Sequence, residues 1–526
     1  MSSHIADNAS KPRMTAASDS RPVVVLDGRG LPVQDVVRLA GSTARPVPGT
    51  DAMKRVEESW NAAREIAAWG RVYGRSTGVG ANRNEDVPTE AAADHGLRLL
   101  RSHAGAIGAE LPADQVRAML AVRANQLLAG GAGLRPTVVT ALCEALETGA
   151  YPVVNEFGSV GTGDIAALAQ MGLALAGEHP WHGDDAPDAQ PLDNNDALAL
   201  ISSNALTLGQ SALALHELRD LITATQLVAA LSLLAVDGSY EAYALPVHEA
   251  RHHRGSYAVA ERMRAILGAP ERPTPPLGRI QDPYGFRCVP QIHGPAHDAA
   301  DALEGVLTVE INAAAENPLI SPEDMTAYHH GGFYMSQLAL ALDHFRLAIT
   351  QVARLSTSRL STLNEPAYTR LRPFLADGEP ASSGVMILEY AAGAALGDLR
   401  AFAAPASLGH AVLSRGVEEQ ASFASLAARQ TLRVCDAYRL VVGCELVAAV
   451  RALRQRDMRP DPSLPVGRAF ALADAALDQD ATDRPLTEDV TQAAELLDSF
   501  TRIADGTDAT DATDGPAGTH RPGGTQ

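Results

Sequence analysis

Residues 421–454, ASFASLAARQTLRVCDAYRLVVGCELVAAVRALR, form one long segment without a proline. Apolar side chains recur along it at intervals of three and four positions, which is the spacing that places them on one face of an α-helix. The resulting stripe consists of Phe423, Leu426, Val434, Ala437, Val441, Cys444 and Val447. A stripe that continues over so many turns is typical of a helix that packs inside a bundle.

The same periodicity recurs elsewhere along the chain. Of the 526 residues, 46% are hydrophobic but only 4% are aromatic, a composition that suits close-packed helices better than β-sheets. We therefore predict an all-α protein with a central bundle of long helices, an N-terminal loop-rich active-site domain and little β-structure. The further helical segments are residues 114–128, 204–236, 297–315, 335–356 and 386–404.

The polarity of the sequence divides the chain into five parts. Both ends are polar, and the C-terminal end repeats Asp-Ala-Thr among glycine and proline, so neither end has the apolar residues that a folded core needs. Residues 22–28 read as a short buried strand that ends in a turn. We predict a disordered N-terminus (1–21), an N-terminal active-site domain (22–203), the long-helix bundle (204–460), a C-terminal helical segment (461–504) and a disordered acidic tail (505–526).

Charge and hydropathy exclude several classes of partner. The formal net charge of −20 disfavours nucleic acid and anionic membrane surfaces as the main partner. The N-terminus lacks the apolar core of a signal peptide, and the longest apolar run, 221–236, reads as too short and too polar to span a bilayer. We expect a cytoplasmic protein that binds a small molecule.

Neither a metal site nor a disulfide framework is predicted. The four cysteines are far apart in the sequence or lie on apolar helical pattern, which indicates structural thiols. The histidine pairs in "RHHR" (251–254) and "HHG" (329–331) lack the spacing with acidic residues that a metal site requires. The cysteines are Cys143, Cys288, Cys435 and Cys444.

Five loops rich in glycine, proline and polar residues interrupt the helical pattern, and chemistry is expected there. Tyr73 could act as a base only if positive charge or amide dipoles lowered its pKa, and the plain alternative is a buried tyrosine with a satisfied hydroxyl. Tyr284 and Arg287 would share one face of a helical turn, where an arginine can bind a carboxylate. The plain alternative there is a polar loop between helices. The loops are residues 73–84, 157–164, 280–294, 329–334 and 413–423.

Taken in order, these loops resemble those of the histidine and phenylalanine/tyrosine ammonia-lyases and their aminomutase relatives. The resemblance extends from about Val23 to residue 454. It implies an all-α homotetramer whose active sites combine loops from more than one subunit. It rests on "YGRSTGVG" (73–80), "RSHAGAIGAELP" (101–112), "IQDPYGFRCVPQIHG" (280–294), "AENPL" (315–319), "HHGGFY" (329–334) and "GVEEQASF" (416–423).

The resemblance also implies roles for individual residues. Tyr73 would remove the β-proton of the substrate, and Arg287 would bind its carboxylate with Tyr284 beside it. Glu418 would lie near the substrate amine. The other implied substrate-binding residues are His103, Gln281, Phe333 and Asn204, the last of which stands two residues away from the family's asparagine.

The loop at 158–164, GSVGTGD, departs from the family pattern. The family reads Gly-Ser-Val-Gly-(Ala/Thr)-Ser-Gly-Asp, and its Ala-Ser-Gly cyclises and loses water to give methylidene-imidazolone, an electrophile that replaces any exogenous cofactor. The serine that supplies the methylidene carbon is the residue missing here. If the gap is placed before Thr162 instead, the triplet becomes Gly161-Thr162-Gly163, whose threonine could lose water to give an ethylidene analogue.

Three functions therefore stay open. The first is an aromatic amino acid ammonia-lyase or aminomutase that uses an electrophile made from residues 161–163. The second is a cofactor-free lyase or isomerase in which Tyr73 and Arg287 act on a substrate whose leaving group needs no electrophile. The third is a catalytically silent relative, against which the presence of both Tyr73 and Arg287 counts.

Overall fold

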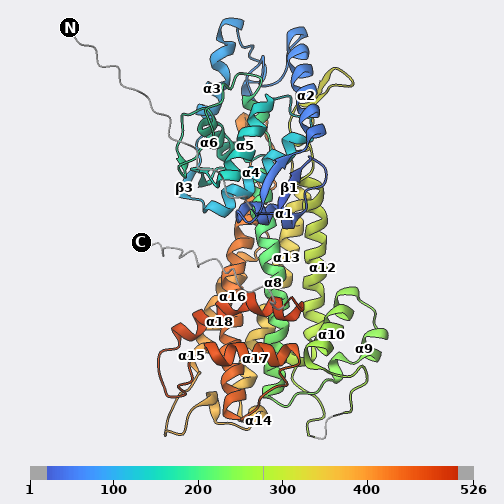
Figure 1. The fold of residues 1–526 in the computed structure, drawn as a ribbon, viewed down its shortest axis with the longest axis vertical. Helices are drawn as coiled ribbons and strands as arrows, with labels where there is room; N and C mark the ends of the chain where they lie inside the picture. Colours follow the sequence, from blue (N-terminus) through green and yellow to red (C-terminus); the bar gives the residue numbers. More distant parts are fainter. Residues whose placement is uncertain (1–19, 276–277, 508–526) are drawn as a thin grey trace, which may run out of the picture.

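The structure is a computed structural model that describes residues 20–275 and 278–507. The molecule is elongated, with long helices along its long axis and smaller elements at both ends (Figure 1). The two segments that the sequence predicts to be disordered lie outside the described residues, apart from 20–21 and 505–507.

Four long helices form the central bundle, as the sequence predicts. Helix α8 packs against α16, α16 packs against α13, and α13 packs against α12. Helix α8 is apolar almost all round and nearly all of its side chains are buried, which is the pattern of a helix at the centre of a bundle. The bounds are α8 (Ala205–Ala235), α12 (Val289–Glu310), α13 (Ser336–Leu363) and α16 (Ala424–Gln455).

The predicted stripe on α16 is confirmed from Val434 to Val447, where all five of its side chains are buried. Phe423 and Leu426 are half-buried at the start of the helix. Phe423 precedes the helix in the left-handed region at φ 55°.

The apolar segment that contains α8 is longer than the run 221–236 that the sequence singles out. By length and mean hydropathy alone, the segment Ala197–Ala235 could cross a membrane, so the prediction that its run is too short was wrong. In the structure, 83% of the most apolar 18-residue stretch of this segment is buried inside the protein. The hydrophobic surface is thus covered by the other helices of the bundle.

Helix α12 begins eight residues before the predicted segment 297–315 and ends at Glu310. Pro295 and Gly294 read as helix breakers in the sequence, but both lie inside the helix. Gly294 is needed because a Cβ there would lie within 2.7 Å of Ser256 backbone atoms on the neighbouring helix. The two helices therefore pack too closely for any larger residue.

The β-structure is limited, as predicted, to four two-stranded sheets among the described residues. Strand β1 confirms the strand predicted in 22–28 and pairs in parallel with β2. The N-terminal elements are β1 (Val23–Leu26), α1 (Val33–Ala40), β2 (Arg45–Pro48), α2 (Thr50–Trp69), α3 (Ala92–His103), β3 (Ile107–Glu110), α4 (Ala113–Leu128), α5 (Pro136–Thr148), β4 (Tyr151–Pro152), β5 (Asn155–Phe157), α6 (Ile165–Leu175), β6 (Trp181–His182) and α7 (Ala197–Ile201).

The remaining elements surround the bundle. Helix α15 packs on α13 and α16, and α18 covers α8 and α16. These elements are α9 (Leu245–Glu249), α10 (Arg254–Leu267), α11 (Tyr284–Arg287), β7 (Leu319–Ser321), β8 (Thr326–Tyr328), α14 (Pro366–Thr369), α15 (Ile387–Phe402), α17 (Pro465–Ala476) and α18 (Thr487–Ala504).

Candidate active site

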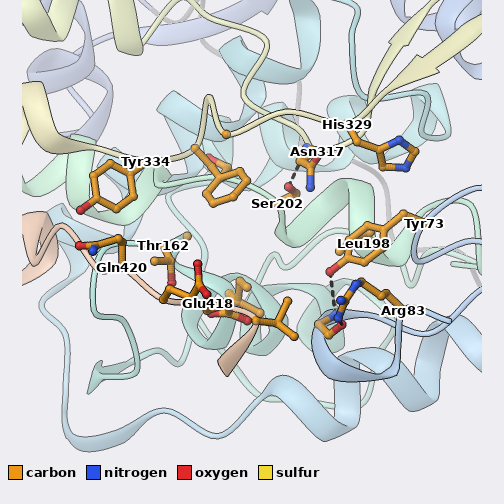
Figure 2. A pocket seen from close by; sticks show the side chains of 18 residues that line it. Tyr73, Arg83, Thr162, Leu198, Ser202, Asn317, His329, Tyr334, Glu418 and Gln420 are labelled. Atoms are coloured by element: carbon orange, nitrogen blue, oxygen red, sulfur yellow. Dashed lines mark hydrogen bonds between the residues drawn. The ribbon is translucent and has the colours of Figure 1, made fainter. Parts of the chain in front are cut away.

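Four of the five predicted loops converge on one cavity of about 610 Å³, here called the Tyr73 cavity. Figure 2 shows Tyr73, Thr162 and Glu418 around it. Residues far apart in the sequence are thus brought together at the end of the bundle where α13 begins. The lining residues are Tyr73, Gly80, Arg83, Thr162, Gly163, Ile165, Leu198, Ser202, Ser203, Asn317, His329, Gly331, Phe333, Tyr334, Val417, Glu418, Glu419 and Gln420.

The loop that carries Tyr73 is anchored by a buried arginine. Arg75 is 2% exposed, and its guanidinium donates to the carbonyl oxygens of Ala132 (2.7 Å) and Gly133 (3.1 Å). Burial lowers the pKa of Arg75 to about 10, so the side chain is still charged at neutral pH. The backbone of the loop is therefore fixed two residues from Tyr73.

The Tyr73 oxygen accepts a hydrogen bond from the backbone N–H of Gly80 at 2.8 Å. Burial of the phenol raises the pKa of Tyr73 above its ordinary value, and the nearby carboxylate of Glu418 raises it further. The Gly80 amide and Arg83 act in the opposite direction, but burial dominates. A base at this position therefore needs positive charge beyond what this chain supplies by itself.

The glycine loop at 158–164 is held on three sides by hydrogen bonds. The Gly163 N–H donates to Oδ1 of Asn204 at 3.1 Å, and the Gly161 carbonyl accepts from the Ser422 hydroxyl at 2.8 Å. The Ser159 hydroxyl donates to the Gly163 carbonyl at 3.0 Å and accepts from the Gly161 N–H at 3.1 Å. Only Thr162 and Gly163 of the triplet reach the cavity.

This loop does not fit a methylidene-imidazolone. The triplet contains no serine to supply the methylidene carbon. With the gap placed before Thr162, Gly161 stands where the family has alanine, and a Cβ there would lie against Ser422 Oγ, 2.8 Å from the Phe423 nitrogen and 2.9 Å from the Ala424 nitrogen. Gly161 also has a φ of 88°, which disfavours any residue with a side chain. The loop is thus built around glycine at this position.

Asn204 connects the glycine loop to the wall of the cavity. Its Nδ2 donates to the Phe333 carbonyl at 2.8 Å, while its Oδ1 accepts from Gly163. Asn204 is fully buried and does not line the cavity. The asparagine that the sequence shows displaced by two residues therefore contacts the triplet through its amide, and it positions Phe333.

His330 fixes the Phe333 segment from the other side. Its Nδ1 accepts from the Gly332 N–H at 2.9 Å, and its Nε2 lies 2.7 Å from the Glu316 carbonyl. A nitrogen that accepts from an amide is unprotonated, and one that bonds a carbonyl must carry hydrogen. These two contacts match the tautomer that carries its hydrogen on Nε2, and they fix the orientation of the ring.

A buried ion pair supports the polar side of the cavity. Arg123 and Glu316 are both almost completely buried, and Nη1 of Arg123 lies 2.8 Å from Oε1 of Glu316. Arg123 Nε also donates to the Leu200 carbonyl at 2.9 Å. The next residue, Asn317, donates its N–H to the Ser202 hydroxyl at 3.0 Å. The pair therefore joins two segments whose ends line the cavity.

The loop that carries Glu418 is bonded to the loop that carries Tyr73. The Ala81 N–H donates to the Ser414 hydroxyl at 2.9 Å, and a short antiparallel bridge joins Leu413 to Glu418. Glu418 and Glu419 both line the cavity. The two carboxylates give this wall an affinity for a cation.

His103 does not line the Tyr73 cavity, although the resemblance implies that it should. It lies in a neighbouring cavity of about 640 Å³ together with His95 and Arg98. Its Nδ1 is 2.8 Å from the Leu99 carbonyl of its own helix. The segment Gly78–Val87 contributes residues to the walls of both cavities.

The predicted carboxylate-binding residues lie at the other end of the bundle. Tyr284 and Arg287 form the single turn α11, and the Arg287 guanidinium lies over the Tyr284 ring at 4.9 Å, so the prediction that they share one face is confirmed. Gln281, beside them, is exposed. The Gly285 carbonyl accepts from Arg359 Nη1 at 3.2 Å.

The length of helix α13 gives the separation between the Tyr73 cavity and the turn that carries Tyr284 and Arg287. Its first residue follows Met335, next to the cavity, and Arg359 is near its last turn. At a rise of about 1.5 Å per residue, Met335 and Arg359 are roughly 35 Å apart. Within one chain, Tyr73 and Arg287 therefore cannot contact the same small molecule.

Several cavity residues were not singled out from the sequence. Arg83, Asn317 and His329 stand inside the quoted segments, but nothing in their spacing distinguished them as residues of this cavity. His329 packs edge-on against the Tyr73 ring, with 6.2 Å between ring centroids. Arg83 and His329 share a position within glycine-rich loops, whereas Asn317 lies in the segment 315–319, which contains no glycine. Among the described residues, no group of three or more His, Cys, Asp or Glu is placed to hold a metal ion.

Known proteins match this chain over most of its length. Residues 31–475 match the family described as aromatic amino acid lyase. Histidine ammonia-lyase of Geobacillus kaustophilus (strain HTA426) is 33% identical over 492 residues, which cover 90% of this chain and 97% of that protein.

Two solved structures have the same fold. Ergothionase from Treponema denticola, an ergothioneine degrading enzyme in complex with desmethyl-ergothioneine sulfonic acid, matches with a TM-score of 0.85 at 26% identity, covering 91% of this chain and 99% of its own. Tyrosine aminomutase from Streptomyces globisporus matches with a TM-score of 0.85 at 25% identity, covering 93% and 99%.

Proposed function

Because the chain belongs to the aromatic amino acid lyase family and is a carbon–nitrogen lyase, we propose that it eliminates an amine from an aromatic amino acid or a derivative of one. Tyr73 is the proposed base. The observation that carries this proposal is the cavity in which the Tyr73 phenol, the glycine loop and two carboxylates meet.

The proposed reaction is a β-elimination. The Tyr73 phenolate takes a proton from the β-carbon, and the electron pair of that C–H bond becomes the second bond between the α- and β-carbons. The α-carbon to nitrogen bond breaks, and the nitrogen leaves with its electron pair as a neutral amine. The products are an α,β-unsaturated acid and the amine. Glu418 and Glu419 hold the cationic nitrogen before it leaves.

A second candidate differs in the leaving group. The glycine loop does not fit the family's electrophile, which favours a substrate whose nitrogen leaves without one. A quaternary ammonium group meets this need. It has no N–H proton for a tyrosinate to remove, whereas a primary ammonium would lose its proton to so strong a base. Ergothioneine, on which the ergothionase of Treponema denticola acts, is a betaine of this kind with an imidazole-derived ring.

The first candidate needs an electrophile made from residues 161–163 and the second does not, so the mass of the proteolytic peptide that contains residues 158–164 distinguishes them. We expect the unmodified mass, because Gly161 is packed against α16 and the triplet lacks a serine. Loss of two waters would instead establish a threonine-derived ring and exclude the cofactor-free candidate. Peptide mass spectrometry of the native protein gives the answer without a substrate. The matched control is the peptide after acid hydrolysis, which reports its amino acid content.

Turnover assays then test the reaction itself. Histidine, tyrosine and phenylalanine are compared with their N,N,N-trimethyl betaines, and formation of the unsaturated acid is followed by its ultraviolet absorbance. Turnover of betaines alone supports the second candidate, and turnover of amino acids alone contradicts it. If no compound is turned over, the third function considered for the sequence, a catalytically silent relative of the family, becomes the better interpretation.

We further propose that the complete site forms between copies of the chain. The roughly 35 Å along α13, from the end that borders the Tyr73 cavity to the end that borders the turn of Arg287, requires a second copy if both residues act on one substrate. Exposed apolar side chains on α13, α15 and the loop that follows α15 are the surface on which we place the contact between copies, since a contact between subunits would bury them. They are Leu340, Leu347, Ile387, Tyr390, Leu408 and Val412.

Mixing two inactive variants tests this arrangement. Tyr73→Phe and Arg287→Ala should each be inactive alone, but refolding them together in equal amounts should restore about one quarter of the wild-type activity, because a quarter of the sites receives both intact residues. Activity is measured after joint and after separate refolding. No recovery in a confirmed mixed oligomer would place both residues in the same chain's site and contradict the proposal.

A further inference from the structure

The Tyr73 cavity has an asymmetric distribution of charge. Among the described residues that line it, Arg83 alone carries a permanent positive charge, while Glu418 and Glu419 carry negative charges. The arginine and the tyrosine belong to the same loop and lie ten residues apart. A cation next to a proposed phenolate base is the kind of group that stabilises the ionised form.

Gly80 links the two side chains. Its N–H donates to the Tyr73 oxygen at 2.8 Å, and its carbonyl accepts from Arg83 Nη1 at 3.3 Å. Figure 2 shows the guanidinium end of Arg83 reaching toward the Tyr73 hydroxyl. Gly80 has a φ of 55°, and a Cβ there would lie 2.5 Å from Ser414 Oγ. The tight turn at glycine is what lets both side chains converge.

The groups that face Tyr73 oppose one another electrostatically. Glu418 raises the pKa of Tyr73 and Arg83 lowers it, while burial of the phenol is the largest cause of its rise. Glu419 lines the same cavity, and the His329 ring packs against the tyrosine ring. Arg83 is therefore the group in this chain whose loss would leave the phenolate facing carboxylates without a compensating charge.

We propose that Arg83 is a positioning residue that stabilises the phenolate form of Tyr73 through its guanidinium charge. It acts on the base and does not bind the substrate. The inference rests on the proposed role of Tyr73 as the base. The positive charge of Arg83 would partly offset the rise in the pKa of Tyr73 that burial and Glu418 cause.

A spectroscopic titration tests the proposal without any substrate. Tyrosinate absorbs in the near ultraviolet, and the difference between the wild-type protein and Tyr73→Phe isolates the titration of Tyr73. In an Arg83→Gln background, we expect this transition to move to higher pH by up to about one unit. Arg83→Lys should retain most of the wild-type value. Arg98→Gln, which removes the same charge from the neighbouring cavity, is the matched control and should leave the transition in place.

Equal transitions in Arg83→Gln and Arg98→Gln would overturn the proposal, whatever the reaction proves to be. Kinetics add a second readout once a substrate is known. The acidic limb of the kcat/KM profile should move upward in Arg83→Gln together with the titration. A rise in KM of tenfold or so with an unmoved profile would mean that Arg83 binds the substrate directly, which also overturns it.

Discussion

Tyr73→Phe should lower kcat by about 10³-fold, since a positioned general base contributes roughly 10² to 10⁴. The variant loses one oxygen atom and the hydrogen bond from the Gly80 N–H, but the ring remains to fill its place beside His329. Substrate should therefore still bind with KM close to the wild-type value. Steady-state kinetics on the substrate identified by the turnover assays measure both constants.

The control for this substitution is Tyr257→Phe, which removes a hydroxyl from α10, where the ring packs against His252. That variant should keep full activity. Wild-type kcat in Tyr73→Phe would show that another group takes the β-proton. The proposal also requires kcat/KM of the wild-type enzyme to rise with pH, because the phenolate and not the phenol is the base.

Glu445→Ala should destabilise the protein by about 3–5 kcal/mol, the usual cost of leaving one partner of a buried ion pair alone. Glu445 and Arg359 are completely buried, and the carboxylate accepts from Arg359 Nε at 2.6 Å and Nη2 at 2.8 Å. It also accepts from the hydroxyls of Ser232 and Ser356. One carboxylate therefore joins α8, α13 and α16 at the centre of the bundle.

Denaturant unfolding at a fixed protein concentration measures this effect. The double variant Arg359→Met/Glu445→Leu should regain most of the lost stability, because replacing a buried pair with apolar residues of similar size is often neutral. A loss below about 1 kcal/mol in Glu445→Ala would show that water or a rearranged side chain solvates Arg359. The double variant also removes the Arg359 guanidinium, which donates to the Gly285 carbonyl. It therefore tests whether the turn that carries Arg287 needs this hydrogen bond to keep its conformation.

The long helices were predictable because their burial is periodic over many turns. Five of the six predicted segments coincide with α4, α8, α13, α15 and α16 within a few residues at most of their ends. The prediction failed at α12, where Pro295 lies inside the helix. A single proline removes one backbone hydrogen bond, and packing against the neighbouring helix outweighs that loss.

The site was predictable only in part. Four distant loops supply Tyr73, Thr162, Phe333 and Glu418, and no spacing in the sequence indicates that these residues meet. Only the resemblance to the family predicted that they share one site. The place of Asn204 depends on the shortened glycine loop, which sets its contact with Gly163. The roles of Arg83 and His329 could not be inferred, because they depend on which way each loop turns at residues such as Gly80.

The packing of Gly161 against the first turn of α16 has a consequence for protein engineering. A side chain placed at Gly161 to rebuild an Ala-Ser-Gly triplet would bring its Cβ against the Ser422 hydroxyl and within 2.9 Å of the backbone nitrogens of Phe423 and Ala424. A graft would have to move the start of a helix of 32 residues. The glycine loop and the first turn of α16 would therefore have to be exchanged together.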